Sequence, residues 1–411
     1  MTGGARPAQP GRRISPGLMV VLGYLSMAGS LSTDLYLPAF PDMAADFGVG
    51  ASAIQLTLTS LLIGAAIGQL TIGSISDALG RRRTLIAGLV LFVACCYLAS
   101  ASPSLEVLIL VRAVQGFAGA AGTVLGRAII SDLAERDQAV RAFSTLFAMI
   151  ALGPALANPL GAWLTQLGGW RAALLGLGVL ATGMLAAALF LVPESLPPDR
   201  RHPFRLSVLA RNAGALLRHR VYMLYAISFA TGYASLLTYL SSSSFIVQDV
   251  LGLTPIGYSL TFSLSAVAIM TGSWVTGRLA HILGAHRTLT LAQSVMIVAA
   301  AAGVLIVALG ALTLTSYLIL VCVFAVACGS TMGTASALAV GLSGRTAGTG
   351  SALLGFIQYV VGAAAAPLGG ILGTQTAMPA VTMMLVFAAL ALISALLAAA
   401  MQARTPPTIE P

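Results

Sequence analysis

The sequence predicts an all-α membrane protein of twelve transmembrane helices, arranged as two six-helix halves with both termini in the cytoplasm. Of its 411 residues, 58% are hydrophobic and 8% are charged, and that charged share is about a third of what ordinary soluble domains carry. A spanning helix needs roughly 20 apolar residues, so a chain of this length accommodates about twelve spans. The apolar runs lack the alternating pattern of a membrane β-barrel, and the spans must therefore be helices.

The predicted organisation has five parts. They are a cytoplasmic tail (1–15), an N-terminal six-helix bundle (16–195), a cytoplasmic central loop (196–220), a C-terminal six-helix bundle (221–402) and a second cytoplasmic tail (403–411). All 21 basic residues are arginine, and they are scattered through short loops on one side of the membrane. The positive-inside rule makes that side the cytoplasm of a bacterial inner membrane protein. Such scatter does not form the single basic surface that a nucleic-acid partner requires.

The first helices of the N-terminal half are expected near residues 16–37, 53–75, 84–100 and 108–130. Asp34 lies near the outer end of the first of these helices, and Arg112 and Gln115 lie within the fourth. The second helix ends in a dense run of charge between Gly73 and Arg83, where the chain leaves the membrane.

The fifth helix carries two prolines flanked by small residues. Proline inside a helix removes one backbone hydrogen bond and bends the helix, and neighbouring helices in a bundle can satisfy the freed groups. The residues that define this segment are Gly153, Pro154, Asn158, Pro159 and Gly161.

The second half repeats the first in outline, with helices expected near residues 221–246, 257–279, 289–312, 316–340, 348–372 and 378–401. Gly73 and Gly80 recur as Gly277 and Gly284, and Asn158-Pro159-Leu160-Gly161 is echoed by Ala366-Pro367-Leu368-Gly369. The echoes fall at equivalent places in the order of spans, which favours two related halves.

Ionisable side chains inside spans are costly to bury and therefore mark candidate functional sites. Asp34 and Arg112 are expected at a similar depth in the outward half of the membrane, where an ion pair or a shared water cavity is possible. Burial favours the neutral form of a carboxyl group and a nearby arginine favours the charged form, an opposition that a proton-coupled carrier can use. The alternatives are that Asp34 caps a helix end and that Arg112 anchors its helix through backbone carbonyls.

A second cluster of charge lies at the cytoplasmic ends of the second and fourth helices. Asp77 and Asp132 are expected to face each other there, and any of Arg81 to Arg83 could bridge them. Asp77 could also face the N-terminus of a helix from the other half. Contacts of this kind would form a conformational latch that breaks when the halves rearrange; the alternative is a purely topological anchor.

Other kinds of site are not indicated. The four cysteines lie inside apolar runs without ligand spacing, so we expect small buried side chains and no metal site. The chain contains no lysine, which excludes a Walker A phosphate loop. We expect no cofactor and no enzymatic activity.

The motifs resemble those of the major facilitator superfamily. Gly73-x-x-x-Asp77-x-x-Gly80-Arg81-Arg82 resembles its loop between helices 2 and 3, Arg112-x-x-Gln115-Gly116 its helix 4 motif, and the helix 5 segment the motif of antiporters. The run Thr33-Asp34-Leu35-Tyr36-Leu37-Pro38-Ala39 resembles the narrower bicyclomycin and chloramphenicol resistance (Bcr/CflA) branch.

This resemblance implies export of small hydrophobic drugs in exchange for protons by alternating access, and a protein that works as a monomer. It assigns proton coupling and substrate binding to Asp34 and Arg112, with Tyr36 and Gln115 beside them. Gly73, Asp77, Gly80, Arg81 and Asp132 would form the latch.

The substrate is less well defined than the class. Tyr233, Thr238 and Tyr239 in the seventh helix are candidates for the lining of a cavity, although such residues also serve as interhelical hydrogen bonds. A single carboxylate suits neutral or weakly cationic compounds such as chloramphenicol-like or bicyclomycin-like drugs. Two other classes of function stay open, which are proton-coupled export or import of a metabolite and a membrane sensor that transports nothing.

Overall fold

The computed structural model describes residues 15–133, 136–201, 206–343, 347–370 and 376–404, which are helical almost throughout and contain no strand. The helices of the first half are α1 (Pro16–Ser26), α2 (Ala28–Asp34), α3 (Phe40–Phe47), α4 (Ala51–Leu79), α5 (Arg81–Ser100), α6 (Leu105–Leu133) and α7 (Arg136–Leu191). After α8 (Leu206–Arg218) come α9 (Arg220–Phe245), α10 (Pro255–Leu283), α11 (Ala285–Ala308), α12 (Leu314–Gly341), α13 (Ala347–Ala365) and α14 (Met378–Arg404). The two predicted tails fall almost entirely outside the described residues.

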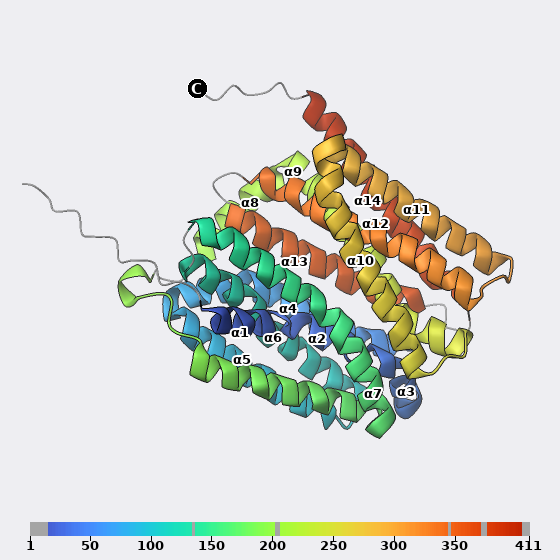
Figure 1. Ribbon diagram of the computed structural model, residues 1–411, viewed down its shortest axis with the longest axis horizontal. Helices are drawn as coiled ribbons and strands as arrows, with labels where there is room; N and C mark the ends of the chain where they lie inside the picture. The colour runs from blue at the N-terminus through green and yellow to red at the C-terminus, as the bar shows by residue number, and fades with distance from the viewer. Residues whose placement is uncertain (1–14, 134–135, 202–205, 344–346, 371–375, 405–411) are drawn as a thin grey trace, which may run out of the picture.

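Eleven segments of the described chain are long and apolar enough to cross a membrane, and one of them supplies two crossings. The 56 residues of α7 would extend about 84 Å as one straight helix, more than twice the thickness of a bilayer. The backbone leaves the helical region at Gly168 and Gly169, and Figure 1 shows the chain reversing there. Leu164 and Gly176 contact each other across this reversal. The fold therefore agrees with the twelve spans predicted from the sequence.

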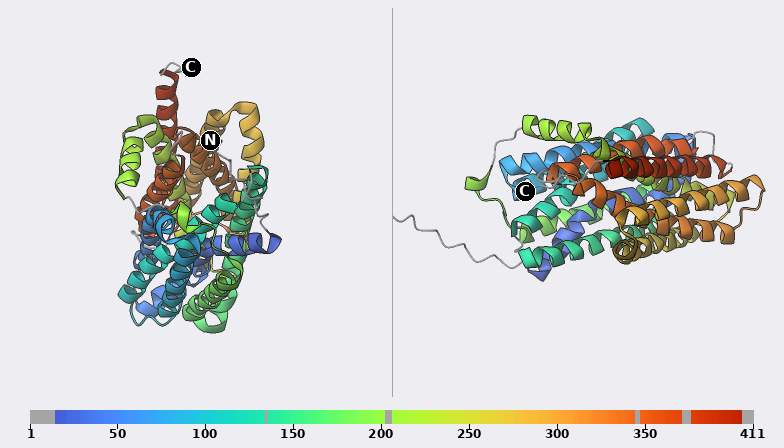
Figure 2. Two further views of the ribbon diagram at one scale, coloured as in Figure 1. Left: turned by 90° about the vertical axis from the view of Figure 1, so that its left-hand side faces the viewer. Right: turned by 90° about the horizontal axis from the view of Figure 1, so that it is seen from above.

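The spans form two bundles that lie side by side, with α1 to α7 in one and α9 to α14 in the other (Figures 1 and 2). They contact each other through α7 with α10 and through α4 with α13. We call the end where α4 meets α5 at Gly80 the basic end, and the end where α3 meets α4 the opposite end. In Figure 1, α7 and α10 meet at the opposite end and diverge towards the basic end.

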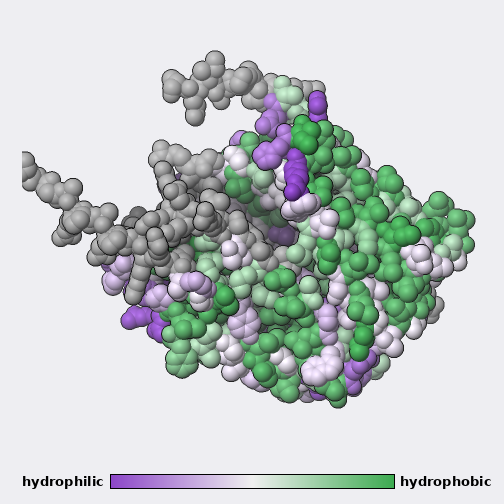
Figure 3. Space-filling view, in the orientation of Figure 1, coloured by the Kyte–Doolittle hydropathy of each residue, from purple (hydrophilic) through white to green (hydrophobic). Residues whose placement is uncertain are grey.

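The surface matches a protein surrounded by lipid. Large apolar side chains such as Leu110, Trp163, Phe190 and Val298 are more than half exposed. Figure 3 shows that such side chains cover the flanks and that hydrophilic ones gather near the ends. Because water is absent from the bilayer core, exposed apolar side chains are favourable there.

The first span is interrupted, which the sequence did not predict. A turn at Met27 separates α1 from α2, and the 3₁₀ segment Leu37–Ala39 separates α2 from α3. Ser30 and Thr33 donate side-chain hydrogen bonds to the carbonyls of Met27 and Ser30 at 3.1 and 3.0 Å, and such bonds bend helices. Pro38 lies at the start of the 3₁₀ segment, where it cannot donate the bond that would continue the helix.

Glycines set the spacing of the central helices. A Cβ atom added at Gly64 would collide with the carbonyl of Ala113, and one at Gly116 would collide with the carbonyl of Leu61. The backbones of α4 and α6 therefore touch, as small residues allow in membrane helices. This contact holds Gln115 and Leu61 on adjoining walls of one cavity.

Two segments differ from the sequence prediction. The three arginines after Gly80 begin α5 and do not form a loop, since Gly80 alone (φ 99°) separates α4 from α5. The predicted central loop contains a helix, α8, which is strongly amphipathic and packs on α9 and α13. The prolines 154 and 159 lie inside α7, and its backbone stays helical through both of them.

Candidate functional site

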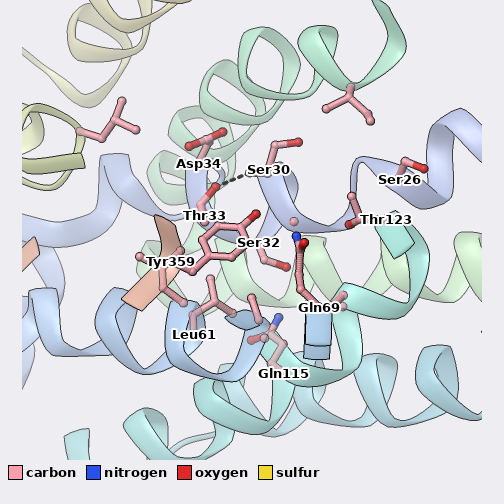
Figure 4. Close-up of a pocket in the computed structure, with 18 of the residues that line it drawn as sticks. Ser26, Ser30, Ser32, Thr33, Asp34, Leu61, Gln69, Gln115, Thr123 and Tyr359 are labelled. Carbon is pink, nitrogen blue, oxygen red and sulfur yellow. Dashed lines mark hydrogen bonds between the residues drawn. The ribbon is translucent and has the colours of Figure 1, made fainter. Parts of the chain in front are cut away.

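A cavity of about 240 Å³ lies between the two halves. Its wall from the first half is formed by α1, α2, α4, α6 and α7, and Tyr233, Leu240 and Tyr359 of α9 and α13 complete it. Figure 4 shows Ser30, Thr33 and Asp34 of α2 on one side, Leu61, Gln69 and Gln115 on the other, and Tyr359 between them. A concave pocket with few convergent polar groups is the usual form of a ligand site.

Asp34 is the only carboxylate among the described residues that line this cavity. It is the last residue of α2, and 4% of its surface is exposed. Within the described part of the chain its carboxylate forms no ion pair, and the side chain of Thr33 is a polar neighbour. Asn158 holds the adjoining backbone by donating to the Asp34 carbonyl at 3.2 Å. The carboxyl group of Asp34 is therefore almost fully withdrawn from the surface and faces the cavity.

Arg112 lies behind the cavity wall and forms no ion pair with Asp34, which the sequence had allowed. It is fully buried and donates to the carbonyl of Ser32 at 2.6 Å and to Gln115 at 3.0 Å. Its guanidinium also stacks on the ring of Tyr36, 3.9 Å from the centroid. The two terminal nitrogens of the guanidinium are engaged by these hydrogen bonds, and the bond to Ser32 is an anchor to a backbone carbonyl. The anchored carbonyl is two residues from Asp34.

Tyr36 and Gln115 support this arrangement from different sides. The hydroxyl of Tyr36 lies 3.2 Å from that of Thr57, and the ring is buried beneath Arg112. Gln115 lines the cavity and donates to the sulfur of Cys96 at 3.1 Å. Of the four residues predicted for coupling and substrate binding, Asp34 and Gln115 reach the cavity, and Arg112 and Tyr36 stand behind it.

The helix 5 segment packs directly on the interrupted first span. A Cβ atom at Gly161 would collide with the carbonyl of Leu35, and one at Gly153 would collide with the hydroxyl of Ser30. Asn158 is fully buried beside the Asp34 backbone. α2 therefore packs along this segment of α7.

The predicted cavity residues of α9 divide into three cases. Tyr233 lines the cavity, with its ring 6.1 Å from that of Tyr359. Tyr239 is buried, donates to Ser265 at 2.9 Å and lines a separate apolar cavity inside the second half. Thr238 lines neither cavity and donates to the carbonyl of Ala234 in its own helix.

The predicted latch residues meet at the basic end. Arg81 forms ion pairs with Asp77 of α4 and with Asp132 of α6, the second at 3.0 Å. Gly80 is required there, because its φ of 99° suits glycine and an added Cβ would crowd Glu194 and Arg201. At Gly73 an added Cβ would meet only Val124, at ordinary contact distance, so packing does not demand glycine.

Sequence reasoning missed several members of both sites. Glu194 accepts a hydrogen bond from the backbone of Arg81 at 2.9 Å, and Ser195 donates to Asp132 at 2.9 Å. Gln69 and Tyr359 line the cavity from opposite halves. A lone tyrosine in the apolar run of α13 was the available signal for Tyr359. Glu194 lies in the run Pro193-Glu194-Ser195-Leu196, which also resembles the Bcr/CflA branch, but the sequence assigned this residue no contact.

The chain matches the sequence profile of the Major Facilitator Superfamily over residues 21–367. It is 32% identical to an uncharacterized MFS-type transporter of Bacillus subtilis, which it matches over 90% of its own length and 92% of that protein. It is 28% identical to a bicyclomycin resistance protein homolog of Haemophilus influenzae, over 88% and 90% of the two chains. A chloramphenicol resistance protein of Pseudomonas aeruginosa is 32% identical over 69% and 66%.

The fold is also that of solved transporters. The xylose transporter XylE of E. coli superposes with a TM-score of 0.73 at 14% identity, covering 96% of this chain and 98% of that one. The profile match covers most of the sequence and the relatives extend along nearly all of it. The chain therefore belongs to the major facilitator superfamily, and its relatives support the Bcr/CflA branch of that superfamily.

Proposed function

We propose that this protein is a proton-coupled drug exporter of a bacterial inner membrane, which moves small neutral hydrophobic antibiotics outward in exchange for protons. The observation that carries the proposal is the buried carboxylate of Asp34, which faces the cavity without a cationic partner among the described residues. The names of the Haemophilus and Pseudomonas relatives support bicyclomycin-like or chloramphenicol-like substrates.

Competition at Asp34 provides the coupling in this proposal. A carboxyl group withdrawn from water favours its neutral form, and a polar drug that enters the same cavity changes the surroundings on which that preference depends. Drug binding and protonation are then linked, and each alters the affinity for the other by the same factor. Arg112 positions α2 through the Ser32 carbonyl, and so sets where the carboxyl group stands.

Alternating access supplies the movement. Hydrogen bonds from Gln55 to Ser241, from Thr59 to Ala363 and from Gln248 to Pro38 join the halves on the side of the opposite end. We propose that the basic end is cytoplasmic and that these contacts close the outward path. Arg81, Asp77 and Asp132 would tie α4, α5 and α6 together in this state and loosen in the other. The protein acts as a monomer in this scheme, and 16–195 and 221–402 are its moving halves.

The experiment compares the wild-type protein with the Asp34→Asn variant in inverted membrane vesicles. Asparagine keeps the shape of the side chain and removes its titration, so drug transport driven by a pH gradient should fall to background while the variant stays folded. Folding is checked by thermal unfolding of the purified protein. Undiminished pH-driven transport by the Asp34→Asn protein would refute the assignment.

A drug panel on a susceptible host then tests the substrate class. We expect the wild-type chain to confer resistance to chloramphenicol-like or bicyclomycin-like compounds and the Asp34→Asn variant to confer none. Resistance to no compound on the panel would favour a metabolite carrier.

A further inference from the structure

Arg127 is an arginine within the α6 span that neither proton coupling nor the latch uses. It lies four residues beyond Thr123, which lines the cavity. Four residues are one turn, or about 6 Å along the helix. Arg127 is therefore on the cavity face of α6, one turn nearer to the basic end, between the cavity and the proposed cytoplasmic entrance.

The side chain of Arg127 is directed back towards the cavity. Side chains on a helix lean towards its N-terminus, and the Nε of Arg127 donates to the carbonyl of Thr123 at 3.1 Å. The guanidinium also lies within electrostatic reach of the Tyr359 hydroxyl of the other half, which in turn is in hydrogen-bonding range of Gln69. Figure 4 shows Thr123, Gln69 and Tyr359 around the same space.

Among the described residues, no carboxylate neutralises this charge. Arg127 takes part in no ion pair within the described part of the chain, and Asp132, the nearest acid along α6, is engaged by Arg81 and Ser195. The second half supplies no alternative acidic partner along most of its length, because the sequence contains neither aspartate nor glutamate between Asp249 and Glu410. Arginine stays protonated in proteins. The entrance to the cavity thus carries a fixed positive charge that a substrate must pass or contact.

We propose that Arg127, with Tyr359 and Gln69, forms a second polar subsite that selects substrates by charge. It favours drugs with an anionic or hydrogen-bond-accepting group, such as nitro, carbonyl or carboxylate, and disfavours permanent monovalent cations. The proposal deepens the proposed export function and rests on it. The physical basis is Coulomb repulsion of like charges where water is scarce, which is stronger than in bulk solvent.

Three variants separate charge from structure. Arg127→Gln removes the charge and keeps a side chain that can bond to Thr123, and Arg127→Lys keeps the charge. Arg278→Gln is the matched control, because Arg278 also lies in a spanning helix but stacks on the exposed ring of Trp274, away from the cavity. Each purified protein is tested for binding, and vesicles that contain it are tested for transport, with chloramphenicol as the neutral acceptor-rich probe and ethidium as the cationic probe.

The ratio of ethidium to chloramphenicol affinity should rise about tenfold in Arg127→Gln, a change equal to about 1.4 kcal/mol. It should stay at the wild-type value in Arg127→Lys and Arg278→Gln. An unchanged ratio in Arg127→Gln, or an equal loss for both probes, would overturn charge selection. If the wild-type protein transports neither probe, the proposed export function is refuted, and the binding ratio still tests the role of Arg127. If the wild-type protein binds neither probe, both the export function and the Arg127 subsite are refuted.

Discussion

At the scale of single residues, Asp34 and Arg112 lie on opposite sides of the short helix α2. Asp34 ends α2 and faces the cavity, and Arg112 holds the Ser32 carbonyl of that helix from behind. The sequence indicated that both charges matter, because ionisable groups are costly inside a membrane. It could not show that the two side chains form no ion pair with each other, because that depends on Tyr36 and Gln115 being within reach of the guanidinium.

Replacing Arg112 should therefore impair coupling through the position of Asp34. Arg112→Ala removes a charged hydrogen bond worth about 1.5–3 kcal/mol, so we expect pH-driven transport to fall roughly 10- to 100-fold. Arg112→Lys, which lacks the planar guanidinium that stacks and bonds at once, should recover only part of it. The measurement is drug transport at a series of imposed pH gradients, beside drug binding. Wild-type coupling in Arg112→Ala would return this residue to a packing role.

At the scale of elements, the helix 5 segment of α7 supports the interrupted first span, which carries Asp34. α2 is only seven residues long, too short to be stable alone, and it rests on Gly153, Asn158 and Gly161 of α7. The sequence predicted this segment as a bent helix because of its prolines, and its glycines and asparagine prove to be the part that touches the site. Which helix lies against them is a tertiary contact that hydropathy does not encode.

Gly161→Ala should test this contact. The added methyl group would collide with the Leu35 carbonyl, next to Asp34, and such overpacking costs about 1–3 kcal/mol. We expect a lower midpoint of thermal unfolding and weaker drug binding. Gly333→Ala is the matched control, a mid-helix glycine of α12 where an added Cβ meets nothing within 4 Å. Equal stability of Gly161→Ala and the control would show that α7 does not brace α2.

At the scale of the whole molecule, hydropathy predicted the twelve spans because each must satisfy its own backbone in lipid. The two halves followed from the echoes of Gly73 and Gly80. What the sequence left out is contact between distant segments, such as Glu194 bonding to the backbone of Arg81 across 113 positions. The cavity likewise needs Tyr359 from the second half to close a wall that the first half begins. The candidate site therefore lies where the halves meet.

A cross-link between the halves would test whether they must separate at the opposite end. Thr59 donates to the carbonyl of Ala363 at 2.8 Å, so a Thr59→Cys and Ala363→Cys pair is close enough for a short, reducible thiol cross-linker. The four native cysteines, none of which forms a disulfide, are first replaced by alanine. Because alternating access requires this end to open, the cross-linked protein should stop transporting, and a reductant should restore transport. Each single-cysteine variant, treated with the same reagent, should keep its transport, and transport that continued at the wild-type rate in the linked protein would exclude this movement.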